Sequence, residues 1–511
     1  MSQVRNKLNK ALSSLDNINI YNANGEKDVV QINKNKNKRR VAILLFDLIF
    51  AFGTPYLMAV FYALIHGVSF SSTFGDYQSI KYAIVGFAIF AIYVSLEIYY
   101  ETTLIYKRQD LFKELLACCF IITTTMILSI IAATAISIYA VPLCMIGLLI
   151  GILINRKFAI YVNIVCIIVF YLCIVVITQE VNAIPVFIGS MTQIISSAIL
   201  ILVSGKKITR LKFLFNSLAS GFFVAFVLTF ILQILDALDT QIIIMTIIVN
   251  SVWSGVSIIL SLAIVMILLP LFENIFLLYS NYKLDELSQP SAKLVNRLAT
   301  EAPGTYNHSL AMANLAEACA MAIGENPALA RCACMYHDMG KLEHPIYFTE
   351  NQTGFNIHER IIPDMSVQII KKHTSAGADM IRANNLPEIL AKVAEEHHGT
   401  QAVSYFLSKT RGFTEDKVEM KDFCYDGPKP STKISGLVMI VDTVEAATRS
   451  QGINNDRIEF VKFIHMLIKS KLDQGQFSEC PLTIKDIQII EDTLVNTLPS
   501  LYHQRIKYNN N

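Results

Sequence analysis

The chain has 511 residues, of which 53% are hydrophobic and 16% are charged. This mixture is too apolar for a soluble enzyme and too charged for a pure channel, so two unlike parts are expected. Apolar residues crowd before position 280, and nine of the ten histidines follow position 300. We therefore expect a membrane part followed by a soluble part. The net charge of +2 gives no reason to expect a nucleic acid polymer as a partner.

The first forty residues are polar, rich in Asn and Lys, and end in a basic cluster from Lys34 to Arg40. They are not a secretory signal, because the apolar run that follows is too long and no small-residue cleavage site closes it. We predict that residues 1–40 form a disordered cytoplasmic tail, whose basic cluster anchors the membrane topology.

Eight apolar segments then follow, each near the ~20 residues that an α-helix needs to cross a bilayer. Alternate loops carry basic residues such as Lys107 and Lys206, whereas the others carry acidic residues such as Glu180. The positive-inside rule then places both termini and the soluble part in the cytoplasm, with the chain anchored in the lipid bilayer. We predict a membrane domain over 41–278, with spans at 41–66, 80–100, 114–133, 135–154, 157–178, 183–204, 211–235 and 242–275.

Few ionisable groups lie inside the predicted spans, and they lie near the span ends, which disfavours a transport role. After the spans, leucines at helical spacing around Pro290 predict two short linker helices within 279–300. From 301 to 511, helices punctuated by Asn-Pro, Leu-Pro and Gly turns predict a soluble all-helical domain. The expected fold class is all-α throughout.

The chemistry centres on the pair His337-Asp338, which is followed by Gly340 and Lys341. Imidazole and carboxylate groups bind divalent ions such as Mn, Fe or Zn, and the lack of cysteine in the cluster disfavours a structural zinc site. Five histidines and two aspartates are too many for one ion, and a carboxylate can bridge two ions, so Asp338 is the expected bridge. The candidate ligands are His308, His337, Asp338, His373, His397, His398 and Asp442.

Two ions about 3.5 to 4 Å apart generate a hydroxide at neutral pH and stabilise a phosphoryl group under in-line attack. Phosphoester hydrolysis is therefore the favoured reaction, with Asp338 and Lys341 as catalytic residues and Lys341 against a phosphate oxygen. Any single histidine could equally be a packed or surface residue. The adjacent imidazoles of His397 and His398, and the carboxylate of Asp442 inside an apolar helix, are costlier to bury without a metal.

Candidates for substrate contact are less constrained. Glu445 and Arg449 lie one and two turns beyond Asp442, where they could support a ligand and contact phosphate, or form a surface pair. Tyr347, just past the metal helix, could stack on a base, but core packing is at least equally expected of this aromatic residue. Thr400, two residues after the histidine pair, is a further candidate.

The order of His308, His337-Asp338 and Asp442 resembles the HD superfamily of metal-dependent phosphohydrolases. Longer stretches are similar to the seven-transmembrane HD family, whose characterised members are PgpH-type cyclic di-AMP phosphodiesterases. The resemblance covers roughly residues 80–508. It rests on Leu269 to Glu273, Glu301 to Ser309, Gly340-Lys341, His397 to Thr400, Gly427 to Pro430 and Val444 to Ala447.

This resemblance implies hydrolysis of cyclic di-AMP to linear pApA at the cell membrane, by attack of a metal-bound hydroxide and with two ions, Mn or Fe. The family typically has an extracellular domain between its first two spans, but only about fifteen residues, around 67–82, occupy that place here. The difference puts external ligand sensing in doubt. By the family pattern one ion is held by His308, His337, Asp338 and Asp442, and the other by Asp338, His373, His397 and His398.

Three alternatives stay open at this point. The branch that cleaves cyclic di-GMP carries a Gly-Tyr-Pro signature that is missing after His398, so cyclic di-AMP is favoured. A membrane receptor whose soluble domain only binds a nucleotide, and a transporter with a regulatory domain, are the other two. The complete ligand set argues against the receptor. The native metal, the base-reading residues and the oligomeric state are left open, with a homodimer as one option.

Overall fold

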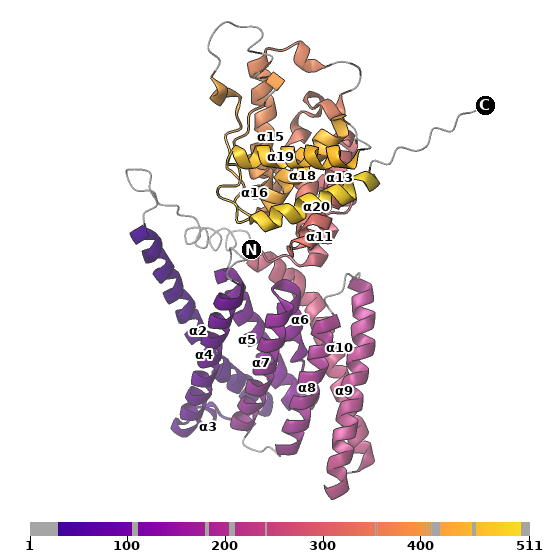
Figure 1. Ribbon diagram of the computed structural model, residues 1–511. Coiled ribbons are helices and arrows are strands. Elements are labelled where there is room, and N and C mark those ends of the chain that lie inside the picture. Colours follow the sequence, from indigo (N-terminus) through magenta and orange to yellow (C-terminus); the bar gives the residue numbers. More distant parts are fainter. Residues whose placement is uncertain are drawn as a thin grey trace, which may run out of the picture. The chain divides into compact units, whose positions relative to one another are not determined.

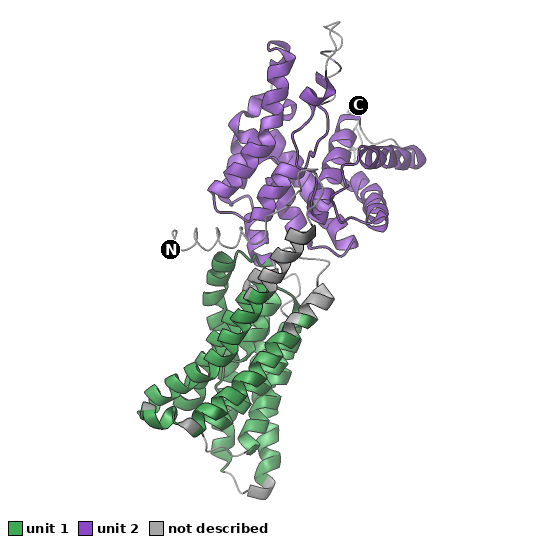
Figure 2. Ribbon diagram, turned by 90° about the vertical axis from the view of Figure 1, so that its left-hand side faces the viewer, with its two compact units in different colours: residues 1–280 green, residues 281–511 purple. Residues whose placement is uncertain are grey.

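The structure is a computed structural model that describes residues 29–104, 111–178, 183–203, 210–240, 243–352, 354, 356–403, 405–406, 408, 410, 419–451 and 456–501. The chain forms two compact units, Met1–Ser280 and Asn281–Asn511 (Figure 1, Figure 2). In the described ranges the only β-type pairing is an isolated bridge between Ala402 and Cys424. The predicted all-α fold class is confirmed.

The first unit is a bundle of apolar helices (Figure 1). Seven of its described helices are long and apolar enough to cross a membrane. Large apolar side chains such as Phe87 and Phe223 are exposed, whereas Ser254 and Thr229 are buried between helices, as expected of a bundle in lipid. The helices are α2 (Val29–His66), α3 (Phe70–Thr73), α4 (Asp76–Leu104), α5 (Leu111–Ala135), α6 (Cys144–Leu153), α7 (Arg156–Thr178), α8 (Ala183–Val203), α9 (Arg210–Thr240) and α10 (Ile244–Phe276).

Helix α2 begins earlier than the sequence analysis predicted. Residues 29–40, which were assigned to a disordered tail, are helical, so this part of the prediction is wrong. The stretch from Val29 to Arg40 contains no glycine or proline that would end the helix before the first span. The remainder of the predicted tail, residues 1–28, lies outside the described residues.

The span predicted at 135–154 is not one membrane-length helix. Helix α5 ends at Ala135, residues 136–143 are irregular, and α6 has only 10 residues. A helix of that length rises about 15 Å, half the thickness of the hydrocarbon core. Pro142, which has no backbone N–H to donate, lies in the irregular stretch just before α6.

Buried polar side chains compensate for this irregular backbone. Gln193 of α8 donates to the carbonyl oxygen of Val141 at 3.0 Å and to the hydroxyl of Ser257 at 3.0 Å. The side-chain oxygen of Asn163 accepts the N–H of Gly147 in α6 at 3.0 Å. Irregular backbone is tolerated at membrane depth where protein buries it and satisfies its polar groups. The segment is therefore suited to the interior of the bundle and not to a lipid-facing surface.

The second unit contains only helices and turns among its described residues. Helix α13 contacts α14, α18 and α20, and α15 packs on α16. Proline at the first turn starts α13, α14 and α15, and Asn326 caps α14 by accepting two backbone N–H groups. The α-helices are α11 (Asn281–Leu287), α12 (Lys293–Glu301), α13 (Pro303–Ala322), α14 (Pro327–Tyr336), α15 (Pro363–Ala383), α16 (Glu388–Glu396), α18 (Lys433–Gln451), α19 (Arg457–Asp473) and α20 (Ile484–Leu501), and the 3-10 helices are η2 (Met339–Glu343), η3 (Pro345–Tyr347), η4 (Thr349–Asn351), η5 (Ile357–Glu359) and η6 (Met420–Phe423).

The linker helices α11 and α12 lie on either side of Pro290, and both belong to the second unit. Helix α11 contacts α14. The phenol of Tyr336, the last residue of α14, donates a buried hydrogen bond to the carbonyl oxygen of Leu287 at 3.1 Å. The segment that follows the last apolar helix is thus bonded to the residue directly before His337.

We predict that the N-terminus and the second unit face the same side of the membrane. The basic loops before α7 and before α9 share one side only if residues 136–154 cross the bilayer as a buried segment. Lys107, Glu180 and Lys206, on which this charge argument also depends, lie outside the described residues. Reporter fusions at residue 1, after Gly67 and at residue 511 would test it, with cytoplasmic, external and cytoplasmic readings expected. An external reading at residue 1 would mean that the segment does not cross.

Candidate metal centre

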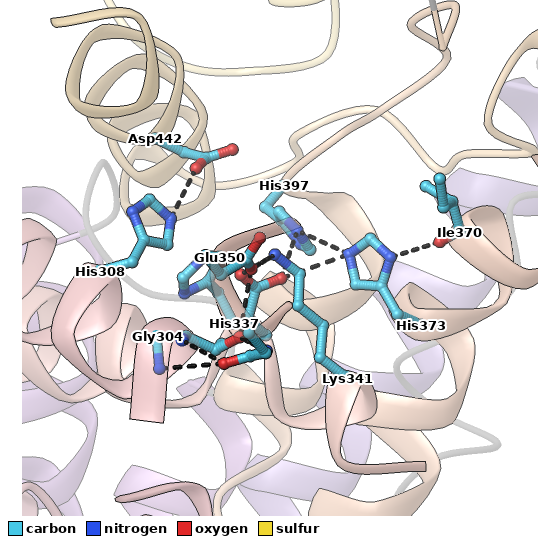
Figure 3. Close-up of polar contacts among 12 residues, drawn as sticks. Gly304, His308, His337, Lys341, Glu350, Ile370, His373, His397 and Asp442 are labelled. Atoms are coloured by element: carbon cyan, nitrogen blue, oxygen red, sulfur yellow. Dashed lines mark hydrogen bonds and ion pairs between the residues drawn. The ribbon is translucent and has the colours of Figure 1, made fainter. Parts of the chain in front are cut away.

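The predicted ligands come from five helices of the second unit and gather at one place (Figure 3). Two groups of side chains have ligand atoms within 4.8 Å of one another. One group is His308, His337 and Asp338, and the other is His373, His397 and His398. Asp442 joins the first group, because its Oδ1 lies 3.1 Å from His308 Nε2.

Three of the histidines are oriented by the carbonyl oxygen three residues earlier in the chain. Nδ1 of His337 lies 2.7 Å from the oxygen of Cys334, and Nδ1 of His397 lies 2.9 Å from the oxygen of Ala394. Nδ1 of His373 makes the same contact with Ile370 (Figure 3). A proton on Nδ1 leaves Nε2 as the lone-pair donor, which is the tautomer that a metal requires.

Asp338 lies between the two groups. Its Oδ1 is 3.3 Å from Nε2 of His373 and 3.7 Å from Nε2 of His397. Its Oδ2 is 3.1 Å from Nε2 of His337. Each carboxylate oxygen therefore faces a different group, which is the arrangement that a bridging ligand needs.

Two buried atoms at this place have no hydrogen-bond partner among the described residues. They are Nε2 of His337 and Oδ1 of Asp338. Polar atoms that are buried without a partner are costly unless a ligand satisfies them. The donor set, five imidazoles and two carboxylates, suits divalent transition-metal ions, so the residues present fit a metal centre.

His308 is held from both sides of its ring. Nδ1 lies 2.5 Å from Oε2 of Glu445, whose side chain is 1% exposed, and Nε2 faces Asp442. Burial lowers the pKa of His308, but the hydrogen bonds to Asp442 and Glu445 outweigh it and raise the pKa to about 9 in the absence of metal. Glu445 therefore orients this ring, as a carboxylate behind a metal-ligating histidine commonly does.

The other group is held neutral. Burial, followed by the charge of His337, lowers the pKa of His397 to about 3. Burial, followed by His397, lowers the pKa of His398 well below its usual range. Burial opposes ionisation of Asp338, but the charges of His337 and Lys341 hold its pKa well below the ordinary value. Neutral imidazoles and an ionised carboxylate are the forms that bind metal.

Lys341 is already paired with two carboxylates. Nζ lies 2.8 Å from Oδ2 of Asp338 and 2.7 Å from Oε1 of Glu350, and the side chain is only 12% exposed. Burial would lower its pKa, but the charges of Asp338 and Glu350 raise it well above the ordinary value. The geometry therefore gives Lys341 the task of holding Asp338, besides the predicted contact with phosphate.

The same network reaches the start of α13. Thr305 lies 3.1 Å from Oε1 of Glu350, and the side-chain oxygen of Asn351 accepts the N–H groups of Gly304 and Thr305 at 2.9 and 3.1 Å (Figure 3). These N–H groups are free ends of the helix that carries His308. The network therefore fixes the position of α13 relative to the turn after His337.

The predicted substrate residues have their described contacts elsewhere. The ring of Tyr347 packs against His344 and His358, and the N–H of Thr400 donates to Gln476 at 3.0 Å. Arg449 is exposed in the last turn of α18. Their roles in substrate binding stay predictions.

The structure adds Tyr425, which the sequence analysis did not single out. Its ring stacks on His398 with centroids 4.4 Å apart and meets His373 edge-on at 6.0 Å. The N–H of Tyr425 donates to the carbonyl oxygen of Gln401 at 2.9 Å, which holds the loop beside the histidine pair. No helical periodicity marks this loop, and the Gly427-Pro428 turn that follows is the one local signal that could have drawn attention to it.

Comparisons with known proteins agree with this architecture. Residues 305–447 match the HD domain family, and residues 77–280 match the family described as 7TM receptor with intracellular HD hydrolase. The chain belongs to these seven-transmembrane HD receptors. It is therefore a multi-pass membrane protein with an intracellular HD domain. The region matched to the membrane family includes the short helix α6.

Two curated relatives share this family. The chain is 36% identical over 425 residues to the cyclic-di-AMP phosphodiesterase PgpH of Bacillus subtilis (strain 168), over 80% of this chain and 58% of the relative. It is 45% identical over 241 residues to the cyclic-di-AMP phosphodiesterase PgpH of Listeria monocytogenes serotype 1/2a (strain 10403S), over 47% and 33% of the two chains. The chain thus spans less than two thirds of each relative.

A solved structure is also similar. The crystal structure of the L. monocytogenes PgpH HD domain in complex with cyclic-di-AMP is 44% identical in sequence and covers 42% of this chain and 99% of its own, with a TM-score of 0.40.

Replacing Gly340 by alanine should disrupt the centre. A Cβ at this position would lie 1.9 Å from the backbone oxygen of His373 and 2.6 Å from the nitrogen of Gly377, so η2 and α15 would have to separate. We expect Gly340→Ala to lower the stability of the second unit by about 1–3 kcal/mol and to reduce bound Mn²⁺. Thermal unfolding followed by a thiol-reactive dye on the buried Cys332 and Cys334, with elemental analysis, measures both. The exposed Ser375→Ala on α15 is the control, and equal values for the two variants would contradict the packing argument.

The carboxylate behind His308 should matter for metal affinity. Glu445→Gln keeps the shape of the side chain but removes its charge, so the ring of His308 is less firmly oriented and less basic. We expect Mn²⁺ affinity to fall about 10- to 100-fold, measured by competition with a chelator. Asp379→Asn is the control, because its side chain is 81% exposed on α15. Unchanged affinity in Glu445→Gln would show that Glu445 does not position the ligand.

Proposed function

We propose that this chain is a membrane-anchored, metal-dependent phosphodiesterase that hydrolyses cyclic di-AMP to linear pApA in the cytoplasm and so controls the level of a second messenger. The observation that carries the proposal is the position of Asp338, whose two oxygens face two separate groups of buried imidazoles. A single structural ion would need only one of these groups.

Each residue of the centre has a task in this proposal. Two bound divalent ions, Mn or Fe, would supply an activated water and neutralise charge on the phosphate. One ion would be held by His308, His337, Asp338 and Asp442, and the other by Asp338, His373, His397 and His398. Lys341 and Glu350 hold Asp338 in place, and Glu445 holds His308.

The choice of substrate rests on the relatives. Two proteins at 36% and 45% identity are cyclic-di-AMP phosphodiesterases, and the matched segments include the family region of the HD domain. The intact donor set supports catalysis over a receptor that only binds nucleotide. The sparse ionisable groups in the apolar helices likewise give a transporter little support.

Product analysis of the purified full-length chain tests the proposal. In detergent with Mn²⁺, we expect cyclic di-AMP to yield pApA and cyclic di-GMP to yield much less product, as measured by chromatography and mass spectrometry. Asp338→Ala should lose metal and at least about 100-fold in turnover, because it removes the bridge. Asp379→Ala, exposed on α15, is the matched control.

Three outcomes would contradict parts of this proposal. Equal cleavage of cyclic di-GMP would remove the base preference. Full metal content and activity in Asp338→Ala would remove the bridging role. Nucleotide binding without hydrolysis by the metal-loaded chain would favour the receptor.

A further inference from the structure

The catalytic centre offers one cation that no carboxylate neutralises. Lys341 is paired with Asp338 and Glu350, so its charge is balanced by the protein itself. Lys471, in the last turn of α19, is different. Among the described residues, no carboxylate oxygen lies within 4.0 Å of its Nζ, and the side chain is partly buried.

The position of Lys471 relates it to the metal centre. Its ammonium group contacts the side-chain oxygen of Gln401, and the N–H of Gln401 donates to the carbonyl oxygen of His398 at 3.2 Å. Burial lowers the pKa of Lys471, and the charge of Asp442 opposes that shift, which places the ammonium group within electrostatic reach of a metal ligand. A partly buried cation without a protein anion is poised to bind an anionic ligand.

A second donor lies beside it. Nε2 of Gln401 is buried and has no acceptor among the described residues. The carbonyl oxygen of Gln401 accepts the N–H of Tyr425, whose ring stacks on His398. The turn that follows the histidine pair therefore carries an unsatisfied amide N–H next to an unneutralised ammonium group, with an aromatic ring at its edge.

We propose that Lys471 and the side-chain amide of Gln401 form a phosphate subsite that binds the second phosphate of the cyclic dinucleotide, the one that is not being cleaved. The inference rests on the proposed function and deepens it. A cyclic dinucleotide carries two phosphodiester anions, and the metal centre neutralises one of them. The other needs its own donors, and a charged donor with a neutral one is a common way to bind a phosphate oxygen.

The subsite makes Lys471 a binding residue for substrates with two phosphates only. We expect Lys471→Met to raise KM for cyclic di-AMP about tenfold or more, with kcat within about threefold. With bis(p-nitrophenyl) phosphate, which has a single phosphodiester, kcat/KM should change less than about twofold. Lys471→Arg should recover most of the affinity, because it keeps the charge. Lys469→Met, exposed on the same helix, is the control.

The test uses the full-length chain loaded with Mn²⁺, with metal content measured for every variant. The subsite is refuted if Lys471→Met keeps the wild-type KM for cyclic di-AMP, and equally if it loses activity on both substrates or loses metal. In those cases the proposed function still stands, because the wild type hydrolyses cyclic di-AMP. If the wild type hydrolyses only bis(p-nitrophenyl) phosphate, the proposed function itself is wrong, and the subsite with it.

Discussion

The centre depends on one carboxylate that has to face two ways. Asp338 can do so because it follows the last turn of α14 and precedes a turn that packs directly on α15. This close approach needs a residue without a side chain at position 340. It also needs a cation behind the carboxylate, since an ionised aspartate buried among imidazoles without one would be strongly destabilising in the absence of metal. Lys341 supplies that cation.

The imidazoles follow a second rule. Three of them lie at or near helix positions where the carbonyl three residues earlier accepts the Nδ1 proton. The helical backbone thus selects the tautomer without help from extra side chains. His308 is the exception, since its partner is the carboxylate of Glu445 on α18. That helix also carries Asp442, so α18 both supplies one ligand and orients another.

The sequence was sufficient to identify the all-α class and to nominate the seven residues that the structure brings together. Such residues are found because helical spacing and the His-Asp pair are local patterns. The pairing of Lys341 with Glu350, and the places of Tyr425 and Lys471, depend on contacts between distant segments that no local pattern encodes. The break before α6 was missed for a related reason: mean apolarity is the same for a continuous span and for a buried half-helix with an irregular lead-in.

The hydrogen bond between Tyr336 and Leu287 has a mechanical meaning. It joins the segment that follows the last apolar helix to the residue whose neighbour is His337, with no loop in between that could absorb a displacement. A shift of α11 along its axis is therefore transmitted as a strain on the ligand cage and not on the entrance to it. In such a linkage the gear and the catalyst are one helix, and the stiffness of α14 sets how faithfully motion becomes a change in coordination.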